Sequence, residues 1–304
     1  MSHYGEIFRE FRLNKQLTLT DLADEQLSVS QLSRFERGDS DLSITKFFYV
    51  LEKLKLTPTQ FMNRVNDYRR NDQIHLMSQM ARAHYQEDSE TLEQLKSSQE
   101  KLFIENPQNK RAHLNAILLQ GALCDLDSTR QMMEEDLAFV SDHLFCTEDW
   151  QIDELILIGN LYQYYPTDLM CRLVDEVVAR RDFYLDIPTH KNLVEVTLLN
   201  IILTLAEREE VSKAVQYDTL LCPLLSNERN AYHRLIYLYV KGFLKFKMHD
   251  ETGQEDMLHA IQAMDWIGNQ HHARTYRKHF KKHVGARFTK NSLTSLLRWD
   301  ENKG

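Results

Sequence analysis

Glycine and proline are scarce in this sequence. Only 9 glycines and 5 prolines occur among 304 residues, less than half of the usual combined share of about 12%. Hairpins and alternating strand–helix units need such residues at every turn, so neither is expected as the main architecture. The composition predicts an all-α protein.

Cysteine is also scarce, and the familiar catalytic motifs are missing. The four cysteines are widely spaced with no CxxC pair, which argues against a zinc knuckle and against a disulfide framework. No HExxH, Walker loop, GxGxxG or GxSxG occurs. We therefore expect a protein of the reduced cytoplasm that is not an enzyme and needs no cofactor.

Long apolar runs are absent. The most apolar stretch, residues 193–206, is interrupted by Glu195 and Asn200 and is too short to cross a bilayer. The N-terminus has no apolar core after a basic start, so a secretory signal is not expected. These features predict a soluble chain with no membrane contact.

An excess of positive charge is absent as well, since 37 Lys and Arg oppose 45 Asp and Glu. The acidic excess lies in residues 71–273, whereas residues 1–70 are nearly neutral and the end of the chain is basic. Any nucleic-acid site must therefore be local. The basic end is expected to pair with the acidic middle or to cap the repeats, and alternatively to extend a DNA footprint; its cations are Arg274, Arg277, Lys278, Lys281, Lys282, Arg287 and Lys290.

A helix-start pattern recurs four times in the first 66 residues. An apolar residue precedes Thr or Ser, and a second apolar residue follows five positions after the first, as in Leu17-Thr18 with Leu22. This is the pattern of an N-cap with a hydrophobic staple. It predicts helices that begin near residues 19, 29, 44 and 58, after a helix over about 4–15. The first two starts have the spacing of a helix-turn-helix, and Gly38 can close its second helix.

A second regularity appears further along the chain. Apolar residues recur at intervals of 40 residues, at Leu118, Ile158, Leu198 and Leu238. This period fits one antiparallel helix pair, and such pairs stack into a solenoid. We expect a five-helix domain over 1–66, a polar linker over 67–73 and a helical-repeat domain over 74–304.

The sequence resembles known regulators at the residues of these two patterns. Residues 8–61 resemble the helix-turn-helix of the phage-repressor (XRE/Cro) class, and LADEQLSVSQLSRFERGDSDLSITKF is similar to the Rgg (MutR-type) transcriptional regulators of Gram-positive bacteria. Tetratricopeptide-like repeats and the ending AYHRLIYLYVKGFLKFK also look like that family. The resemblance implies a dimeric, quorum-sensing transcription factor whose repeat domain binds a short signalling peptide on its concave face.

The second helix of the motif is expected to enter the major groove of DNA. Its first residues, Val29, Ser30 and Gln31, suit base edges, although Gln31 is also placed to cap Ser28. Arg34 and Arg37 lie further along the same helix, and Arg34 suits a phosphate. The position where this class often has a DNA-clamping Gln holds Leu19 or Thr20, so one backbone contact is in doubt.

Three cations of the first predicted helix form a weaker set. Arg9, Arg12 and Lys15 share one broad face, which favours either phosphate contacts or an ordinary solvated surface. The helix-turn-helix core is expected to contain Leu22, Ala23, Leu32, Phe35, Phe47 and Leu51.

The best peptide-binding candidates lie two positions after the first three apolar residues of the 40-residue repeat. They form a column of carboxamides, Gln120, Asn160 and Asn200, called the carboxamide column below. Such side chains can donate to and accept from the main chain of an extended peptide. The alternative is that they bond helices within the solenoid. Weaker candidates are Arg111 for a carboxylate, Asn115, and Tyr239 and Trp266 as aromatic walls.

The spacing of the histidines does not predict a metal site. His279 and His283 lie four residues apart on a predicted helix, with His271 and His272 before them. No third ligand is indicated nearby, so surface histidines are the favoured interpretation and no metal is expected.

The sequence thus favours a homodimer that binds a pseudo-palindromic double-stranded operator and a short hydrophobic peptide. Two alternatives remain. One is a helical-repeat adaptor for a protein partner, and the other is a repressor that needs no ligand.

Overall fold

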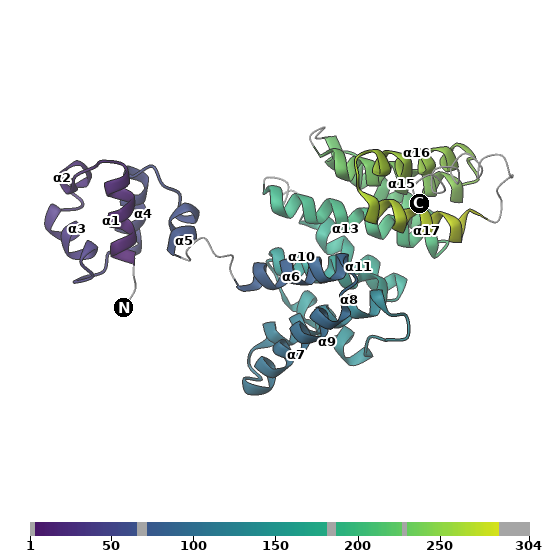
Figure 1. Ribbon diagram of the computed structural model, residues 1–304, viewed down its shortest axis with the longest axis horizontal. Helices are drawn as coiled ribbons and strands as arrows, with labels where there is room; N and C mark the ends of the chain where they lie inside the picture. The colour runs from purple at the N-terminus through teal and green to yellow at the C-terminus, as the bar shows by residue number, and fades with distance from the viewer. Residues whose placement is uncertain (1–3, 66–71, 181–186, 227–229, 286–304) are drawn as a thin grey trace, which may run out of the picture. The chain divides into compact units, whose positions relative to one another are not determined.

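The computed structural model describes residues 4–65, 72–180, 187–226 and 230–285, and every regular element within these ranges is helical. Contacts divide the chain into two compact units, residues 1–81 and 82–304. No helix among the described residues is long and apolar enough to cross a membrane. The expected all-α fold is confirmed (Figure 1).

Helices of the first unit begin where the capping pattern predicts. They are α1 (Tyr4–Asn14), α2 (Leu19–Leu22), α3 (Val29–Glu36), α4 (Ile44–Lys53) and α5 (Pro58–Val65). Each N-cap hydroxyl accepts a hydrogen bond from the backbone three residues on, as Ser28 does from Gln31 and Ser43 from Lys46. The start of α2 also has a reciprocal pair between Thr18 and Asp21. These local bonds satisfy the free N–H groups of the first turns.

The first unit has one apolar core, and the predicted members belong to it. Leu22, Leu32, Phe35 and Leu51 are buried, while Ala23 and Phe47 pack against them from its edge. Aromatic rings from four helices meet in this core, with Phe8 of α1 lying 5.6 Å from Phe35 of α3. The core therefore fixes α3 against α1.

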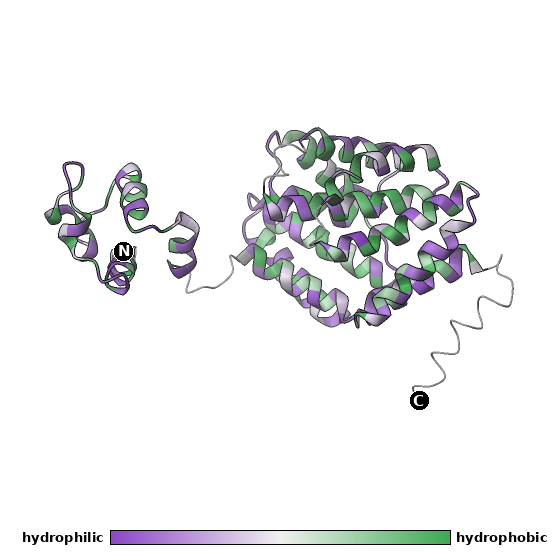
Figure 2. Cartoon of the chain, turned by 90° about the horizontal axis from the view of Figure 1, so that it is seen from above, coloured by the Kyte–Doolittle hydropathy of each residue, from purple (hydrophilic) through white to green (hydrophobic). Residues whose placement is uncertain are grey.

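The second unit is a stack of helix pairs. Its helices are α7 (Ser89–Glu105), α8 (Lys110–Leu126), α9 (Glu134–Cys146), α10 (Ile152–Leu161), α11 (Thr167–Ala179), α13 (Pro188–Glu207), α14 (Val211–Leu221), α15 (Ala231–Lys247), α16 (Thr252–Trp266) and α17 (Gln270–His283). Figure 2 shows hydrophobic residues concentrated on the helices in the interior of this unit. The pairing follows the contacts, since α7 packs on α8, α13 on α14 and α15 on α16.

The 40-residue period corresponds to one layer of this stack. Leu118, Ile158, Leu198 and Leu238 lie on α8, α10, α13 and α15 respectively, and each of these helices packs on the next. The first three are buried and Leu238 is half-buried, because these positions face neighbouring helices of the stack. The predicted period is therefore confirmed as a structural repeat.

The division between the units falls inside α6 (Asp72–Tyr85). Residues 67–71 of the predicted linker lie outside the described residues. The last turn of α6 belongs to the second unit, where Tyr85 lies 4.2 Å from the ring of His271 on α17. Helices from the start and the end of the second unit thus touch each other.

Candidate nucleic-acid interface and ligand site

The N-terminal end of α3 is accessible. Val29, Ser30 and Arg34 are exposed. Gln31 is half-buried, because its Oε1 accepts from the backbone N–H of Ser28 at 3.2 Å and from Lys46 Nζ at 3.4 Å. Its capping role is confirmed, and a base contact stays a prediction for its amide group.

The turn before α3 is anchored to α4 by one carboxylate. Asp24 accepts from the backbone N–H groups of Gln26 and Leu27 at 2.9 and 3.1 Å, and from the side chains of Lys53 and Tyr49 on α4. The Lys53 ammonium and the Tyr49 hydroxyl hold the pKa of Asp24 well below its usual range. An ionised carboxylate therefore links the turn before α3 to α4.

Arg12 does not face solvent, so its predicted phosphate contact is wrong. Its guanidinium binds both carboxylate oxygens of Glu36, from Nε at 2.6 Å and from Nη2 at 2.8 Å. Nη1 donates to the carbonyl of Leu17 at 2.7 Å. Only 7% of Arg12 and 6% of Glu36 are accessible. Arg12 ties α1 to the end of α3, because burial leaves its charge no other partner.

The other predicted cations are exposed. Arg9 on α1 and Lys15, directly after that helix, are exposed. Arg37, directly after α3, donates to Asp39 at 2.7 Å and to Ser33 Oγ at 2.7 Å, so DNA would have to compete with these bonds. Contacts of these cations and of Arg34 with phosphates remain predictions.

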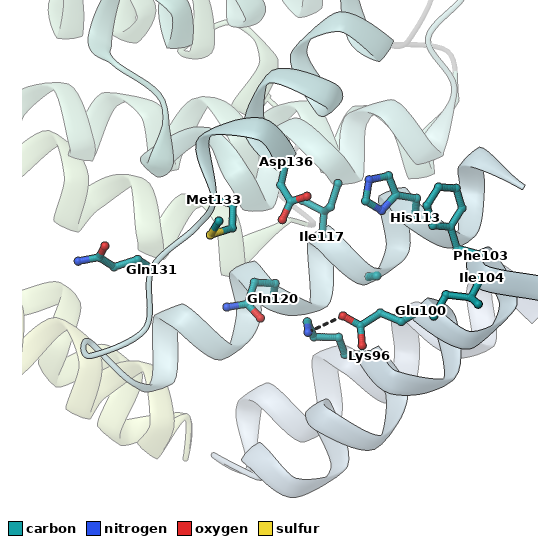
Figure 3. A pocket seen from close by; sticks show the side chains of 11 residues that line it. Lys96, Glu100, Phe103, Ile104, His113, Ile117, Gln120, Gln131, Met133 and Asp136 are labelled. Carbon is teal, nitrogen blue, oxygen red and sulfur yellow. Dashed lines mark hydrogen bonds and ion pairs between the residues drawn. The ribbon is translucent and has the colours of Figure 1, made fainter. Parts of the chain in front are cut away.

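A pocket of about 510 Å³ lies in the second unit. It is lined from α7, α8, the α8–α9 connection and the first turn of α9, by Lys96, Glu100, Phe103, Ile104, His113, Ala116, Ile117, Gln120, Gln131, Met133 and Asp136. Figure 3 shows the Lys96–Glu100 ion pair on one side and the His113 and Phe103 rings on the other. These rings stack 4.5 Å apart and nearly parallel. An apolar pocket with a few polar groups suits a partly hydrophobic ligand.

The carboxamide column does not share this pocket. Gln120 lines it, whereas Asn160 and Asn200 do not. Asn160 is exposed on α10, and its Nδ2 donates to the carbonyl of Ile156 in its own helix at 2.7 Å. Asn200 is half-buried on α13. Peptide binding by the column therefore stays a prediction.

Two of the weaker peptide candidates are wrong because they are buried. Asn115 is 5% accessible, and its amide donates to Gln99 on α7 at 3.1 Å. Tyr239 has no accessible surface, and its hydroxyl donates to the carbonyl of Tyr276 at 3.1 Å. Both side chains hold neighbouring helices together instead of lining an open groove.

The remaining candidates lie at the surface. Arg111 is exposed and forms an ion pair with Asp153 on α10. Trp266 is 69% exposed at the end of α16, so it is available to a partner.

A carboxylate missed at the sequence level lies beside the histidine pair. Glu207, at the end of α13, places Oε1 2.9 Å from Nε2 of His279 and 3.5 Å from Nε2 of His283. The expectation that these histidines have no nearby third ligand is therefore wrong. No sequence spacing could have found it, because the contact depends on how α17 packs.

A capped helix-turn-helix unit joined to stacked helix pairs defines a class of regulator. The family described as "HTH-type transcriptional regulator Rgg, C-terminal domain" matches residues 92–278. The chain therefore belongs to the Rgg family of transcriptional regulators.

Solved structures agree with this assignment. The Streptococcus dysgalactiae SHP pheromone receptor Rgg2 is 25% identical, with a TM-score of 0.76 over 92% of this chain and 100% of that one. A protein from Listeria monocytogenes EGD-e has a TM-score of 0.79 at 16% identity, over 93% and 97% of the two chains. The PrgX/cCF10 complex has a TM-score of 0.66 at 15% identity, over 95% of both chains. The last two show the fold alone.

Proposed function

We propose that this protein is a homodimeric transcriptional regulator that reads an operator with α3 and responds to a short hydrophobic peptide bound by its repeat unit. The observation that carries the proposal is the exposed face of α3, a capped helix that presents Ser30 in its first turn and Arg34 in its last turn to solvent. The likeness to a pheromone receptor over the whole length of that chain supports the peptide. The first unit carries little net charge, so two copies on a two-fold operator supply the phosphate contacts that one lacks.

Substitutions on α3 test the DNA interface. Gln31→Glu keeps the oxygen that caps Ser28 but removes the amide donor, and Ser30→Ala removes the hydroxyl. Each is expected to weaken operator binding by about 5- to 150-fold, since a base contact is worth about 1–3 kcal/mol. Arg34→Ala should weaken binding to all sequences and lower the salt slope by about one. Gel-shift titrations at several salt concentrations measure both effects.

Arg234→Ala, an exposed arginine on α15, is the matched control and should leave operator affinity unchanged. Wild-type affinity in all three α3 variants would contradict the interface. Binding of a protein partner without any binding of operator DNA would instead favour the helical-repeat adaptor.

A double substitution tests the peptide site. Asn160→Ala with Asn200→Ala removes two carboxamides of the column, each of which can exchange two hydrogen bonds with a peptide main chain. Loss of each unshared bond costs about 1 kcal/mol, so we expect peptide affinity to fall at least about tenfold. Fluorescence polarisation with labelled hydrophobic peptides encoded beside the gene measures this change.

Operator binding without peptide should be unaffected in the same variant, and Gln262→Ala, an exposed carboxamide on α16, should bind peptide normally. Unchanged peptide affinity in the double variant would show that Asn160 and Asn200 do not bind the peptide. The pocket around Gln120 would then be the better candidate for the peptide site. Absence of any peptide effect on operator binding would favour the ligand-independent repressor.

A further inference from the structure

Three possible metal ligands from two helices converge in the second unit. His279 and His283 lie four residues apart on α17, so both rings project from one face of that helix. Glu207 reaches them from the end of α13, and the three candidate ligand atoms lie within 4.8 Å of one another. The rings themselves are 4.5 Å apart and inclined by 30°.

The two imidazole nitrogens that face Glu207 lie within ion-pair distance of its Oε1, at 2.9 and 3.5 Å. Nε2 of His279 and Nε2 of His283 are shielded from solvent, and neither makes a hydrogen bond of acceptable geometry with the described residues. A buried polar atom without a hydrogen bond lowers the stability of the fold, unless it binds a proton or an ion. A single carboxylate oxygen close to both nitrogens shows where a cation would lie.

The tautomer of His279 favours a cation. Tyr239 donates its one hydroxyl hydrogen to the carbonyl of Tyr276, and the same hydroxyl lies 2.7 Å from Nδ1 of His279. The hydroxyl can then only accept from Nδ1–H, which leaves a lone pair on Nε2. Such a second hydrogen bond commonly orients a metal-binding histidine.

The side chains around this cluster shield it in part from solvent. Phe243 is fully buried, and its ring lies nearly perpendicular to both imidazoles, with centroids 4.7 Å from His279 and 5.5 Å from His283. Lys247, which lies over the same ring, is neutralised by Glu209 at 2.5 Å. About a third of the Glu207 side chain remains accessible, so solvent can reach the site and fill a fourth position.

We propose that Glu207, His279 and His283 form a binding site for a divalent transition-metal ion of the zinc type. Two imidazole nitrogens and one carboxylate oxygen with an open fourth position are a ligand set that zinc accepts. Zinc would hold such atoms about 3.4 Å apart, so the present spacing needs only small side-chain rotations. The ion would fasten α17, whose first turn contacts Tyr85, to the middle of the repeat unit.

The test is calorimetric titration of metal-free full-length protein with Zn²⁺, with a parallel titration by Co²⁺. We expect one high-affinity site per chain, a Co²⁺ spectrum of tetrahedral type without a thiolate band, and a higher melting temperature with Zn²⁺, because the ion binds only the folded state. Glu207→Gln and His283→Gln should each lower affinity more than about tenfold. Tyr239→Phe should lower it about 10- to 100-fold, because it removes the hydroxyl that orients the His279 ring.

His259→Gln, an exposed histidine on α16, is the control and should bind as wild type. Unchanged affinity in the Glu207 and His283 variants would overturn the proposal, as would a thiolate band, which would place the ion on cysteine. If a variant does not fold, the wild-type stoichiometry and spectrum still decide the matter. Absence of Zn²⁺ binding by the wild type would also overturn the proposal. The cluster would then be only an ion pair between Glu207 and histidine.

Discussion

Gly5→Ala is expected to abolish operator binding while leaving the repeat unit folded. A Cβ atom at position 5 would lie 1.9 Å from the carbonyl oxygen of Phe35 and 2.9 Å from its carbonyl carbon. Both are backbone atoms of α3, so no side-chain rotation relieves the overlap. Helix α1 would have to move away from α3, which separates Phe8 from Phe35 in the core.

The free energies make this a large effect. Alanine favours a helix by at most about 1 kcal/mol over glycine, and Gly5 lies in the first turn of α1. Overpacking against backbone costs about 3 kcal/mol or more. A small domain has a total stability of only about 5 kcal/mol or little more. The net cost is therefore about 2 kcal/mol or more, at least about two fifths of that stability, and the displacement of α1 disturbs the position of α3 that DNA recognition needs.

Thermal unfolding followed by circular dichroism, together with operator gel shifts, measures the result. We expect one early transition from the first unit, an unchanged transition from the second, and no specific complex. Gly38→Asn is the control, because Gly38 has a φ of +74° with no atom close to a new Cβ, and asparagine tolerates that backbone region. Wild-type melting of Gly5→Ala would mean that α1 and α3 are not packed as described.

The helix starts of the first unit could be predicted because their cause is local. Each N-cap hydroxyl bonds a backbone group three residues away, so the information lies within one short segment, as at Ser28 and Gln31. The 40-residue repeat could be predicted for a different reason. Packing of α8, α10 and α13 repeats the same contact, so Leu118, Ile158 and Leu198 are buried in register.

The scarcity of glycine indicated helices, but it did not show what the few glycines do. Gly5, Gly242 and Gly253 lie within helices where another backbone approaches, and a Cβ on Gly253 would meet the carbonyl oxygen of Gly242 at 2.2 Å. The role of a turn glycine such as Gly38 can be predicted from the residues next to it in the sequence. A glycine at a helix crossing is required by a backbone segment far away in the sequence, so local sequence patterns do not identify it.

The candidate sites were predicted less well for the same reason. Spacing placed Arg12 beside Arg9 and Lys15, but only the packing of α3 brings Glu36 to it. Tyr239 was expected at a groove, whereas the fit of α17 against α15 buries it under Tyr276 and His279. Glu207 reaches the histidines of α17 from α13, across another helix interface. Long-range contacts decide which polar side chains are free to bind a ligand.

Replacing one partner of the Arg12–Glu36 pair is expected to be much worse than replacing both. Arg12→Met leaves a buried carboxylate without its cation, and Glu36→Leu leaves a buried guanidinium without its anion. Each single change should destabilise the first unit by about 3–5 kcal/mol. The double variant replaces the pair by apolar groups and leaves only the carbonyl of Leu17 without its donor, a cost of about 1 kcal/mol.

Denaturant unfolding of the four proteins gives the coupling energy between the two residues, and operator titrations of the double variant decide what Arg12 does. A positioning role predicts near-normal operator affinity and an unchanged salt slope once the fold is restored. A phosphate contact by Arg12 would instead lower both, since each neutralised phosphate adds about one to the slope. Glu36 already occupies the Nε–Nη2 edge of the guanidinium, and the carbonyl of Leu17 accepts from Nη1. We therefore expect the first outcome, in which α1 affects DNA recognition only through the position it gives α3.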